Sequence, residues 1–195
     1  CGKTMIAARC PGLLGSPDRE TSEAIARIHD VAGLLPPGSD PGAVARPFRA
    51  PHHTVSSAGM IGGMNLHPGE CSLAHGGVLF LDEFTEFPRH VRESVRYPTE
   101  DGAIDLARGS GRIIFPTRYW LIAAVNPCPC GFFGHPTRAC TCSPEDRARH
   151  TARWQGDPLL RNAEVIRLAP VSSSALLSGS DRWPDTAELR ARVTG

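Results

Sequence analysis

Residues Gly76-Gly-Val-Leu-Phe-Leu-Asp-Glu-Phe84 decide the fold of this chain. Four apolar residues, 78–81, run without a polar break and lead into two adjacent carboxylates. A short apolar run after Gly-Gly predicts a strand buried on both faces, as in a parallel sheet. The carboxyl end of such a strand is where open α/β sheets bind ligands. Asp82 can hold Mg²⁺ through water, and Glu83 can orient or deprotonate a water; the alternative is a solvated acidic turn.

The first residues of the chain carry a second signal. Cys1-Gly-Lys-Thr4 matches the last four positions of the P-loop pattern G-x-x-x-x-G-K-[ST]. In a P-loop the backbone N–H groups cradle phosphates, the lysine binds the β/γ oxygens and the hydroxyl binds Mg²⁺. Lys3 is the only lysine among 21 Lys and Arg residues. Together with the strand that ends in Asp82-Glu83, the motif predicts the fold of a P-loop nucleoside triphosphatase.

The chain begins inside this motif, at Cys1. The earlier glycines of a P-loop, and the strand that precedes them, are not in the sequence. We therefore expect a fragment of a longer protein. We also expect no significant ATP hydrolysis by the fragment alone, because half of the phosphate-cradling N–H groups would be missing.

Composition limits the classes of partner. A chain of 195 residues with 41% hydrophobic residues suits a single domain with a sizeable core. The formal net charge of +1 gives no bulk attraction to nucleic acid or membrane, so any DNA contact must use a local patch. Apolar runs stay far below the ~18 residues of a membrane span. We expect a cytoplasmic protein that does not enter the membrane.

Helical and strand patterns fill most of the remaining sequence. Ser16-Pro-Asp-Arg-Glu20 predicts the start of a helix that runs to Gly33, and alternating runs around Gly109-Ser-Gly111 predict a β-hairpin. Other expected elements are helices at 5–9, at 88–95 and beginning at 144 and 186, a short strand at 163–168, an exposed Gly-rich loop at 59–68 and a linker at 172–184. Pro11 and Pro98 are expected to end the first two of these helices.

Two further polar positions are candidates for a site. Tyr119–Val125 predicts another buried strand, and Asn126 follows its carboxyl end. A polar amide there can hold an attacking water or the γ-phosphate; the alternative is a turn-forming asparagine before Pro127. His52 and His53, in a loop bounded by prolines, can bind metal or phosphate; the alternative is a pair of solvated histidines.

Four of the seven cysteines form the pattern C-x-C-x₉-C-x-C, at Cys128, Cys130, Cys140 and Cys142. Four thiolates suit a tetrahedral Zn²⁺, and a closed set of four leaves no position for substrate, which indicates a structural site. Reduced thiols in a cytosolic ATPase favour metal over two disulfides. The spacing is unusual, His135 is an alternative ligand, and two reduced pairs in a surface loop are the alternative to a site. Cys10 and Cys71 resemble ordinary small buried residues.

These pieces together resemble the Mg-chelatase-like AAA+ ATPases of bacteria, the ComM-type competence proteins. The most specific pieces are Arg46-Pro-Phe-Arg-Ala-Pro-His-His-Thr54, Gly77-Val-Leu-Phe-Leu-Asp-Glu83, Asn126-Pro-Cys-Pro-Cys-Gly131 and Cys140-Thr-Cys-Ser-Pro144. The resemblance implies a homo-oligomer, a hexameric ring that binds ATP and Mg²⁺ between subunits. It also implies ATP-driven DNA branch migration during the uptake of foreign DNA, with the hairpin around 109–111 as the candidate for reaching a pore.

The resemblance assigns roles to matching positions. Gly2, Lys3 and Thr4 match the P-loop, Asp82 and Glu83 match the Walker B pair, and Asn126 matches the sensor-1 residue. Thr4 and Asp82 are the expected Mg²⁺ ligands.

One region departs from the family. Where the family usually reads P-L-L-D-R-I-D, this chain reads Pro158-Leu-Leu-Arg-Asn-Ala-Glu164, so one residue is deleted and both acids are displaced. Arg161 matches the family's arginine, which resembles a trans-acting finger, and Tyr97 stands where the family usually has glutamine. We expect residues 1–171 to form an AAA+ core without its first strand, and 172–195 to form a linker and the start of a helical lid. Unpaired apolar edges would then make the isolated chain express poorly or as a molten species.

Three functions compete at this point. The first is an ATPase motor on DNA. The second is a chelatase motor subunit that drives metal insertion into a porphyrin, and the cysteine pairs after Asn126 favour the first over it. The third is a truncated gene product without a function of its own.

Overall fold

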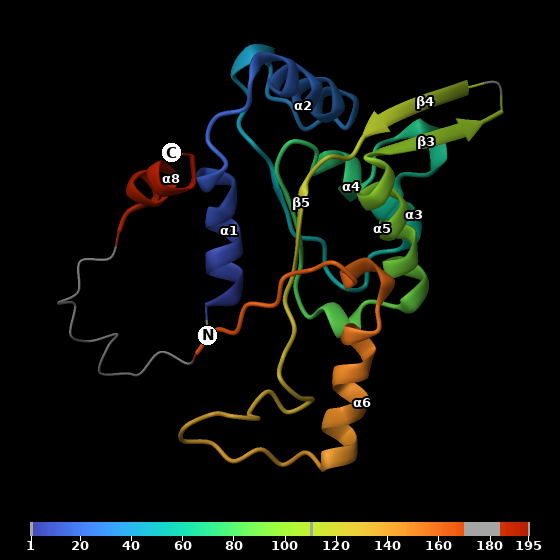
Figure 1. The fold of residues 1–195 in the computed structure, drawn as a ribbon. Coiled ribbons are helices and arrows are strands. Elements are labelled where there is room, and N and C mark those ends of the chain that lie inside the picture. The colour runs from blue at the N-terminus through green and yellow to red at the C-terminus, as the bar shows by residue number, and fades with distance from the viewer. Residues whose placement is uncertain (1, 110, 170–183, 195) are drawn as a thin grey trace.

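The computed structural model describes residues 2–109, 111–169 and 184–194. Its central feature is a parallel sheet in which β2 (Val78–Leu81) lies between β1 (Phe48–Arg49) and β5 (Trp120–Ala123) (Figure 1). Val78 pairs with Trp120 and Leu81 with Ala123, so β2 and β5 are in register over their full length. The α/β class and the pairing of these two strands are therefore confirmed.

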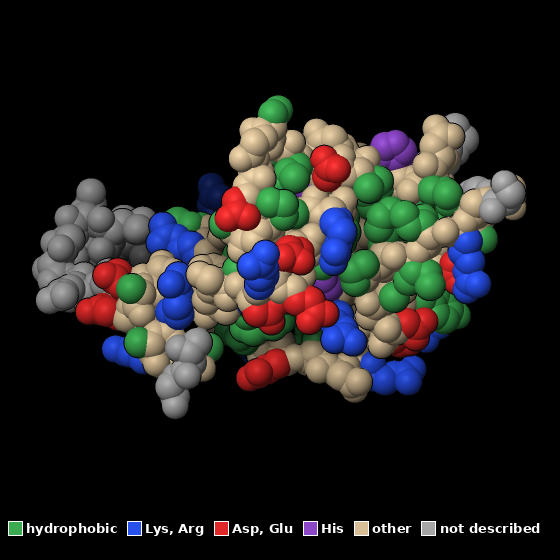
Figure 2. Space-filling model, turned by 90° about the horizontal axis from the view of Figure 1, so that it is seen from above, with side chains coloured by type: hydrophobic (Ala, Val, Ile, Leu, Met, Phe, Trp, Pro, Cys, Tyr) green, Lys and Arg blue, Asp and Glu red, His purple; other side chains and the backbone are tan. Residues whose placement is uncertain are grey.

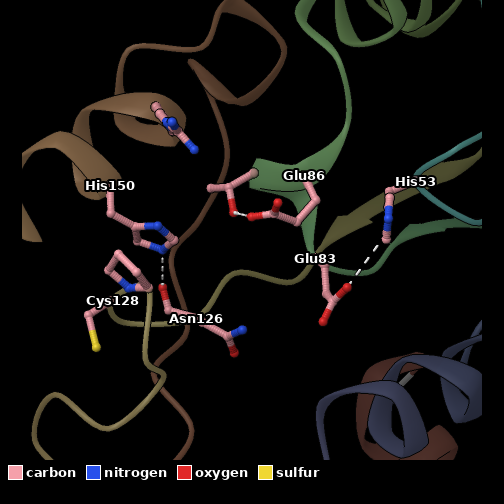
Figure 3. A pocket seen from close by; sticks show the side chains of 9 residues that line it. His53, Glu83, Glu86, Asn126, Cys128 and His150 are labelled. Atoms are coloured by element: carbon pink, nitrogen blue, oxygen red, sulfur yellow. Dashed lines mark hydrogen bonds and ion pairs between the residues drawn. The ribbon is translucent and has the colours of Figure 1, made fainter. Parts of the chain in front are cut away.

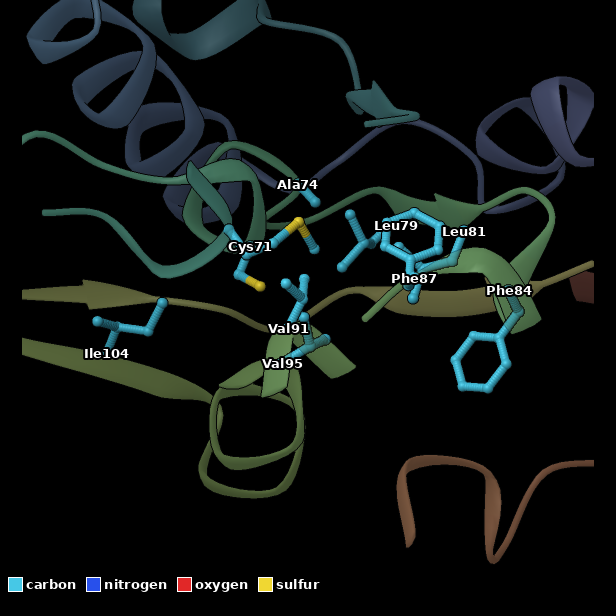
Figure 4. Packing of buried hydrophobic residues seen from close by; sticks show 10 residues of the cluster. Cys71, Ala74, Leu79, Leu81, Phe84, Phe87, Val91, Val95 and Ile104 are labelled. Carbon is cyan, nitrogen blue, oxygen red and sulfur yellow. The ribbon is translucent and has the colours of Figure 1, made fainter. Parts of the chain in front are cut away.

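The middle strand is buried on both faces. Alternate side chains of a strand point to opposite sides of its sheet. Leu79 and Leu81 pack into the larger hydrophobic cluster, whereas Val78 and Phe80 pack with Ala7 of helix α1 (Lys3–Leu13) on the other side. Each of these four strand residues is at most 1% exposed, which explains the uninterrupted apolar run. Figure 4 shows the larger cluster, whose other buried members are Met60, Cys71, Ala74, Phe84, Phe87, Val91, Val95 and Ile104.

Helices surround this sheet. After α1, the α-helices are α2 (Arg19–Val31), α3 (Ser57–Ile61), α4 (Glu70–Leu73), α5 (Arg89–Asp101), α6 (Pro144–Gln155) and α8 (Thr186–Thr194). The short 3₁₀ turns are η1 (Pro41–Ala43), η2 (Met64–Leu66), η3 (Phe84–Glu86) and η4 (Pro158–Leu160). Within the described ranges, every helix is too short or too polar to cross a membrane.

Side-chain caps set two helix starts as the sequence predicts. The Asp18 carboxylate accepts from the backbone N–H of Thr21, and the Ser143 hydroxyl accepts from that of Asp146. These bonds satisfy N–H groups that have no partner inside the helix. The starts of α2 and α6 are therefore confirmed.

Two helices run through prolines that were expected to end them. Pro11 lies inside α1, and Pro98 lies inside α5. Each proline costs its helix one N–H bond, and a side chain from elsewhere in the chain binds a carbonyl oxygen at or next to each proline. Arg190 Nε donates to the carbonyl oxygen of Gly12 at 2.6 Å, and Thr117 Oγ1 donates to that of Pro98 at 2.6 Å.

The predicted hairpin is present as β3 (Ala103–Arg108) and β4 (Gly111–Pro116), paired from Ala103↔Pro116 to Arg108↔Gly111. The far ends of both strands, at Arg108 and Gly111, extend away from the body of the molecule (Figure 1). The base of the hairpin packs on α2 through Phe115 and Ile28. Figure 2 views this side from above and shows hydrophobic side chains beside charged ones, consistent with a surface groove between α2 and β4.

Two predictions about local structure are wrong. Residues 59–68 were expected to form an exposed loop, but they contribute α3 and η2, and Met60 is fully buried. Gly62, at φ 96°, forms a bridge with Pro68 that folds the segment back on itself. Residues 163–168 pair with none of the described strands, and Ile166 is 75% exposed, so its apolar pattern does not produce a strand.

The expected division of the chain lies at 171/172, and most of the expected linker, 172–184, also lies outside the described residues. The division therefore stays a prediction. The described part of this region is α8, which packs against α1 (Figure 1).

We predict that Gly77→Ala destabilises the protein strongly. A Cβ at Gly77 would lie 2.0 Å from the carbonyl oxygen of Pro47, which accepts the N–H of Val78. The side chain would push β1 from β2, and overpacking of this kind costs about 2–3 kcal/mol or more. Urea denaturation measures the loss. Gly42→Ala is the control, because its nearest neighbour would be Asp40 Oδ1 at 3.4 Å; equal stability of the two variants would contradict the packing described here.

Candidate active site

Polar side chains from three elements meet at the carboxyl edge of the sheet. Asp82 directly follows β2, and Asn126 is the third residue after the end of β5. The first turn of α1 supplies Lys3 and Thr4. Because parallel strands end at the same edge of a sheet, the two strand ends and the helix start lie together.

Two hydrogen bonds join the helix to the strand ends. Lys3 Nζ donates to Asn126 Oδ1 at 2.7 Å and reaches the carbonyl oxygen of Val125 at 3.4 Å. Thr4 Oγ1 donates to Asp82 Oδ2 at 2.8 Å. The structure therefore brings together four residues that the sequence singled out from distant places; the roles of these residues stay a prediction.

The start of α1 is a helix end, and the first N–H groups of a helix have no partner within the helix itself. Gly2 precedes the helix at φ 74°, a left-handed conformation that glycine adopts without strain. No side chain caps this helix end, and its first turn contains no acidic residue. The unpaired N–H groups and the helix dipole together favour an anion at this position.

Asp82, the first residue of the acidic pair, is held by two hydrogen bonds. Both oxygens of Asp82 accept hydrogen bonds, Oδ2 from Thr4 and Oδ1 from the backbone N–H of Glu83 at 2.9 Å. A hydroxyl and a carboxylate are oxygen donors of the kind that Mg²⁺ prefers, so Thr4 and Asp82 fit the expected metal.

Glu83 sits in a strained backbone conformation. Its φ of 50° and ψ of 46° are left-handed, which costs a residue with a side chain about 1–2 kcal/mol. The next residue stabilises this turn, because the N–H of Phe84 donates to the carbonyl oxygen of Ala124 at 3.0 Å. The turn leaves the Glu83 side chain 56% exposed. Strain of this kind is concentrated at functional sites, where it aims a side chain.

His53 faces Glu83. The ring Nδ1 of His53 lies 3.6 Å from Glu83 Oε2 (Figure 3). The His53 ring also lies beside the tilted ring of His52, with centroids 4.0 Å apart. Its edge contacts the ring of Phe87. The sequence indicated His53 only as a ligand for metal or phosphate, or as a solvated residue. Its contact with Glu83 joins residues 30 positions apart, so the spacing of neighbouring residues could not predict it.

A cavity of about 430 Å³ opens beside these residues. Glu83 and Asn126 line it together with His53, His150, Cys128, Pro129, Thr85, Glu86 and Arg153 (Figure 3). His150, on α6, is 6% exposed, and its Nε2 lies 2.9 Å from the carbonyl oxygen of Asn126. Sequence reasoning missed this histidine, because a single histidine in a helix rich in arginine carries no pattern.

Arg161 stands apart from this cluster. It follows η4 and is exposed, and among the described residues no side-chain contact joins it to Glu83 or Asn126. A buried ion pair between Arg92 of α5 and Asp157 fixes η4, and Arg92 also lies over the ring of Phe84. The turn η4 is therefore anchored on the core; the expected deletion in this region stays a prediction.

The four clustered cysteines lie next to the cavity. Their Sγ atoms all lie within 4.8 Å of one another, and Cys128 lines the cavity itself. His135, the alternative ligand, does not belong to this group. Its Nδ1 instead accepts from the backbone N–H groups of Thr137 and Arg138.

Comparison with known proteins assigns the chain to a family. Residues 1–174 match the family described as magnesium chelatase, subunit ChlI. The chain therefore belongs to the Mg-chelatase family, as its motifs suggest.

Similar proteins occur in distant bacteria. An uncharacterized protein of Mycobacterium tuberculosis is 39% identical over 98% of this chain and 38% of its own length. YifB of Escherichia coli is 40% identical over 91% of this chain and 34% of its own length. Competence protein ComM of Haemophilus influenzae is 38% identical over 98% of this chain and 37% of its own length. The chain thus spans little more than a third of these relatives.

Proposed function

We propose that this chain is the nucleotide-binding part of an AAA+ ATPase motor of this family. The observation that carries the proposal is the pair of contacts Lys3–Asn126 and Thr4–Asp82. They assemble, at one sheet edge, an ammonium group, a hydroxyl, a carboxylate and an amide, which are the groups that phosphoryl transfer needs.

The same residues divide the work of hydrolysis. The N–H groups that follow Gly2 bind phosphate oxygens, and Lys3 exchanges its bond to Asn126 for one to the β/γ oxygens. Thr4 and Asp82 hold Mg²⁺, which when bound neutralises charge on the phosphates.

Glu83 orients the water and takes its proton as the new bond to the γ-phosphorus forms and the bond to the β-phosphate oxygen breaks. Asn126, freed from Lys3, holds this water or the γ-phosphate with its amide.

The oligomeric proposal rests on Arg161. An exposed arginine on an anchored turn, away from its own Glu83, suits a residue that contacts the nucleotide of a neighbouring subunit. A trans-acting arginine stabilises charge in the transition state. We infer that the full-length protein forms a hexameric ring in the cytoplasm, with ATP between subunits.

For the coupled activity we favour DNA branch migration. One relative is named a competence protein, and the β3–β4 hairpin lies away from the body, where it can reach a bound strand (Figure 1). Insertion of metal into a porphyrin is the second candidate, favoured by the family's description. The four clustered cysteines support the first candidate, because they belong to the ComM-type pattern.

We predict different defects for two substitutions in the full-length gene product: one removes ATP binding, and the other removes turnover but keeps binding. Lys3→Ala should abolish ATP binding, because no other lysine is present in this chain. Glu83→Gln should keep binding and lower turnover about 100-fold or more, because only the group that accepts the proton is lost. Fluorescent nucleotide titration and phosphate release measure the two effects. Glu93→Gln, in an exposed pair with Arg89, is the control; normal turnover by Glu83→Gln would rule out the role of Glu83.

We predict a smaller effect for His53→Ala. A partly exposed polar contact is worth little, so loss of the partner that holds Glu83 should lower kcat about two- to fivefold and leave ATP affinity unchanged. Steady-state ATPase kinetics measure both values, with the exposed His90→Ala on α5 as the control. An unchanged kcat, or a loss confined to affinity, would show that His53 does not position Glu83.

A further inference from the structure

Four thiols converge in the loop between β5 and α6. The Sγ of Cys128 lies 3.4 Å from that of Cys130 and 3.7 Å from that of Cys140, and the Sγ atoms of Cys130 and Cys140 are 3.6 Å apart. The Sγ of Cys142 lies within 4.8 Å of the other three. Four sulfurs around a tetrahedral Zn²⁺, at Zn–S of about 2.3 Å, would be about 3.8 Å apart. The observed separations are close to that value.

The backbone supports the same arrangement. The N–H of Phe133 donates to Cys128 Sγ at 3.3 Å, and the N–H of Cys130 donates to Cys142 Sγ at 3.4 Å. Outer hydrogen bonds to the ligand atoms are the usual support of a metal site. All four residues are free cysteines in the structure.

Two arginines are held in or beside the cysteine loop. Arg147 donates to the carbonyl oxygen of Cys142 at 3.0 Å and lies over the ring of Phe133. Arg138 lies over the ring of Phe132 in the same loop. Four thiolates around Zn²⁺ carry a net charge of −2, so Arg147, which contacts the backbone of Cys142, favours the charged cluster.

We propose that Cys128, Cys130, Cys140 and Cys142 bind one Zn²⁺ in a closed, structural site. Each thiol that binds gives its proton to solvent, so the site forms with release of protons. With all four positions filled by sulfur, the metal has no open place for a substrate.

The position of the site indicates that it would connect the end of β5 to helix α6. Asn126 and Cys128 are two residues apart, and α6 begins two residues after Cys142. Helix α6 then brings His150 back to the carbonyl oxygen of Asn126. The metal would therefore close the loop 127–143 and hold both the strand end that carries Asn126 and the helix that contacts it.

The two other described cysteines serve as internal comparison. Cys71 is fully buried in the core, and burial raises the pKa of its thiol to about 12. Cys10 lies in α1, and its Sγ lies 3.5 Å from the carbonyl oxygen of Ile6. Neither belongs to the cluster, so a substitution at Cys10 tests whether loss of any thiol is enough to lose metal.

The experiment measures zinc in the full-length gene product, purified without a histidine tag under reducing conditions and dialysed against metal-free buffer. We expect about one zinc per chain in the wild type and in Cys10→Ser, and none in Cys140→Ser/Cys142→Ser. Circular dichroism checks that the double variant is folded.

A second measurement on the wild type does not depend on that variant. Cobalt added to the zinc-depleted protein should give the thiolate charge-transfer absorption and strong visible bands of a tetrahedral sulfur site. Zinc removal should also speed tryptic cleavage after the exposed Arg138. The proposal is overturned if the reduced wild type takes up neither metal, or if the double variant holds as much zinc as the wild type. Isolation of the four residues as disulfides that resist reduction and exclude zinc would also overturn it. These readouts do not require ATP turnover, so they stand apart from the proposed motor function.

Discussion

The contact of the first turn of α1 with the ends of β2 and β5 is the constraint on which the site depends. Lys3 and Thr4 each find one partner, Asn126 and Asp82, at the end of a different strand. These bonds satisfy polar groups at the sheet edge and keep an ammonium group beside unpaired helix N–H donors. A phosphate group that enters would replace protein partners with ligand partners, at little cost in reorganisation. The resting contacts thus hold the residues near the positions that the proposed function needs.

The buried strand makes this arrangement rigid. β2 is enclosed on both faces, and its exit is fixed by the bond from the N–H of Phe84 to the carbonyl oxygen of Ala124, the residue directly after β5. The left-handed turn at Glu83 persists because the surrounding core determines it. Through this turn Asp82 contacts Thr4 at the start of α1, and Glu83 faces the cavity and His53. A proposed metal in the loop after Asn126 would extend the same principle to the neighbouring strand end.

Local patterns in the sequence predicted the parts of this structure that local chemistry determines. The apolar run of β2, the starts of α2 and α6 and the hairpin each depend on neighbouring residues, and each is confirmed. Other features do not follow from local sequence. The helices continue through Pro11 and Pro98, where the local pattern predicted that they would end. His53 and His150 line the cavity because they contact Glu83 and Asn126. These partners lie 30 and 24 positions away in the sequence, and no spacing rule indicates such contacts.

A structure of the full-length gene product with Mg²⁺ and a non-hydrolysable ATP analogue tests the central claim most directly. The account predicts the triphosphate against the N–H groups that follow Gly2, with Lys3 Nζ moved from Asn126 to phosphate oxygens and the metal beside Thr4 and Asp82. A nucleotide bound elsewhere, or a nucleotide that leaves the Lys3–Asn126 bond intact, would contradict it.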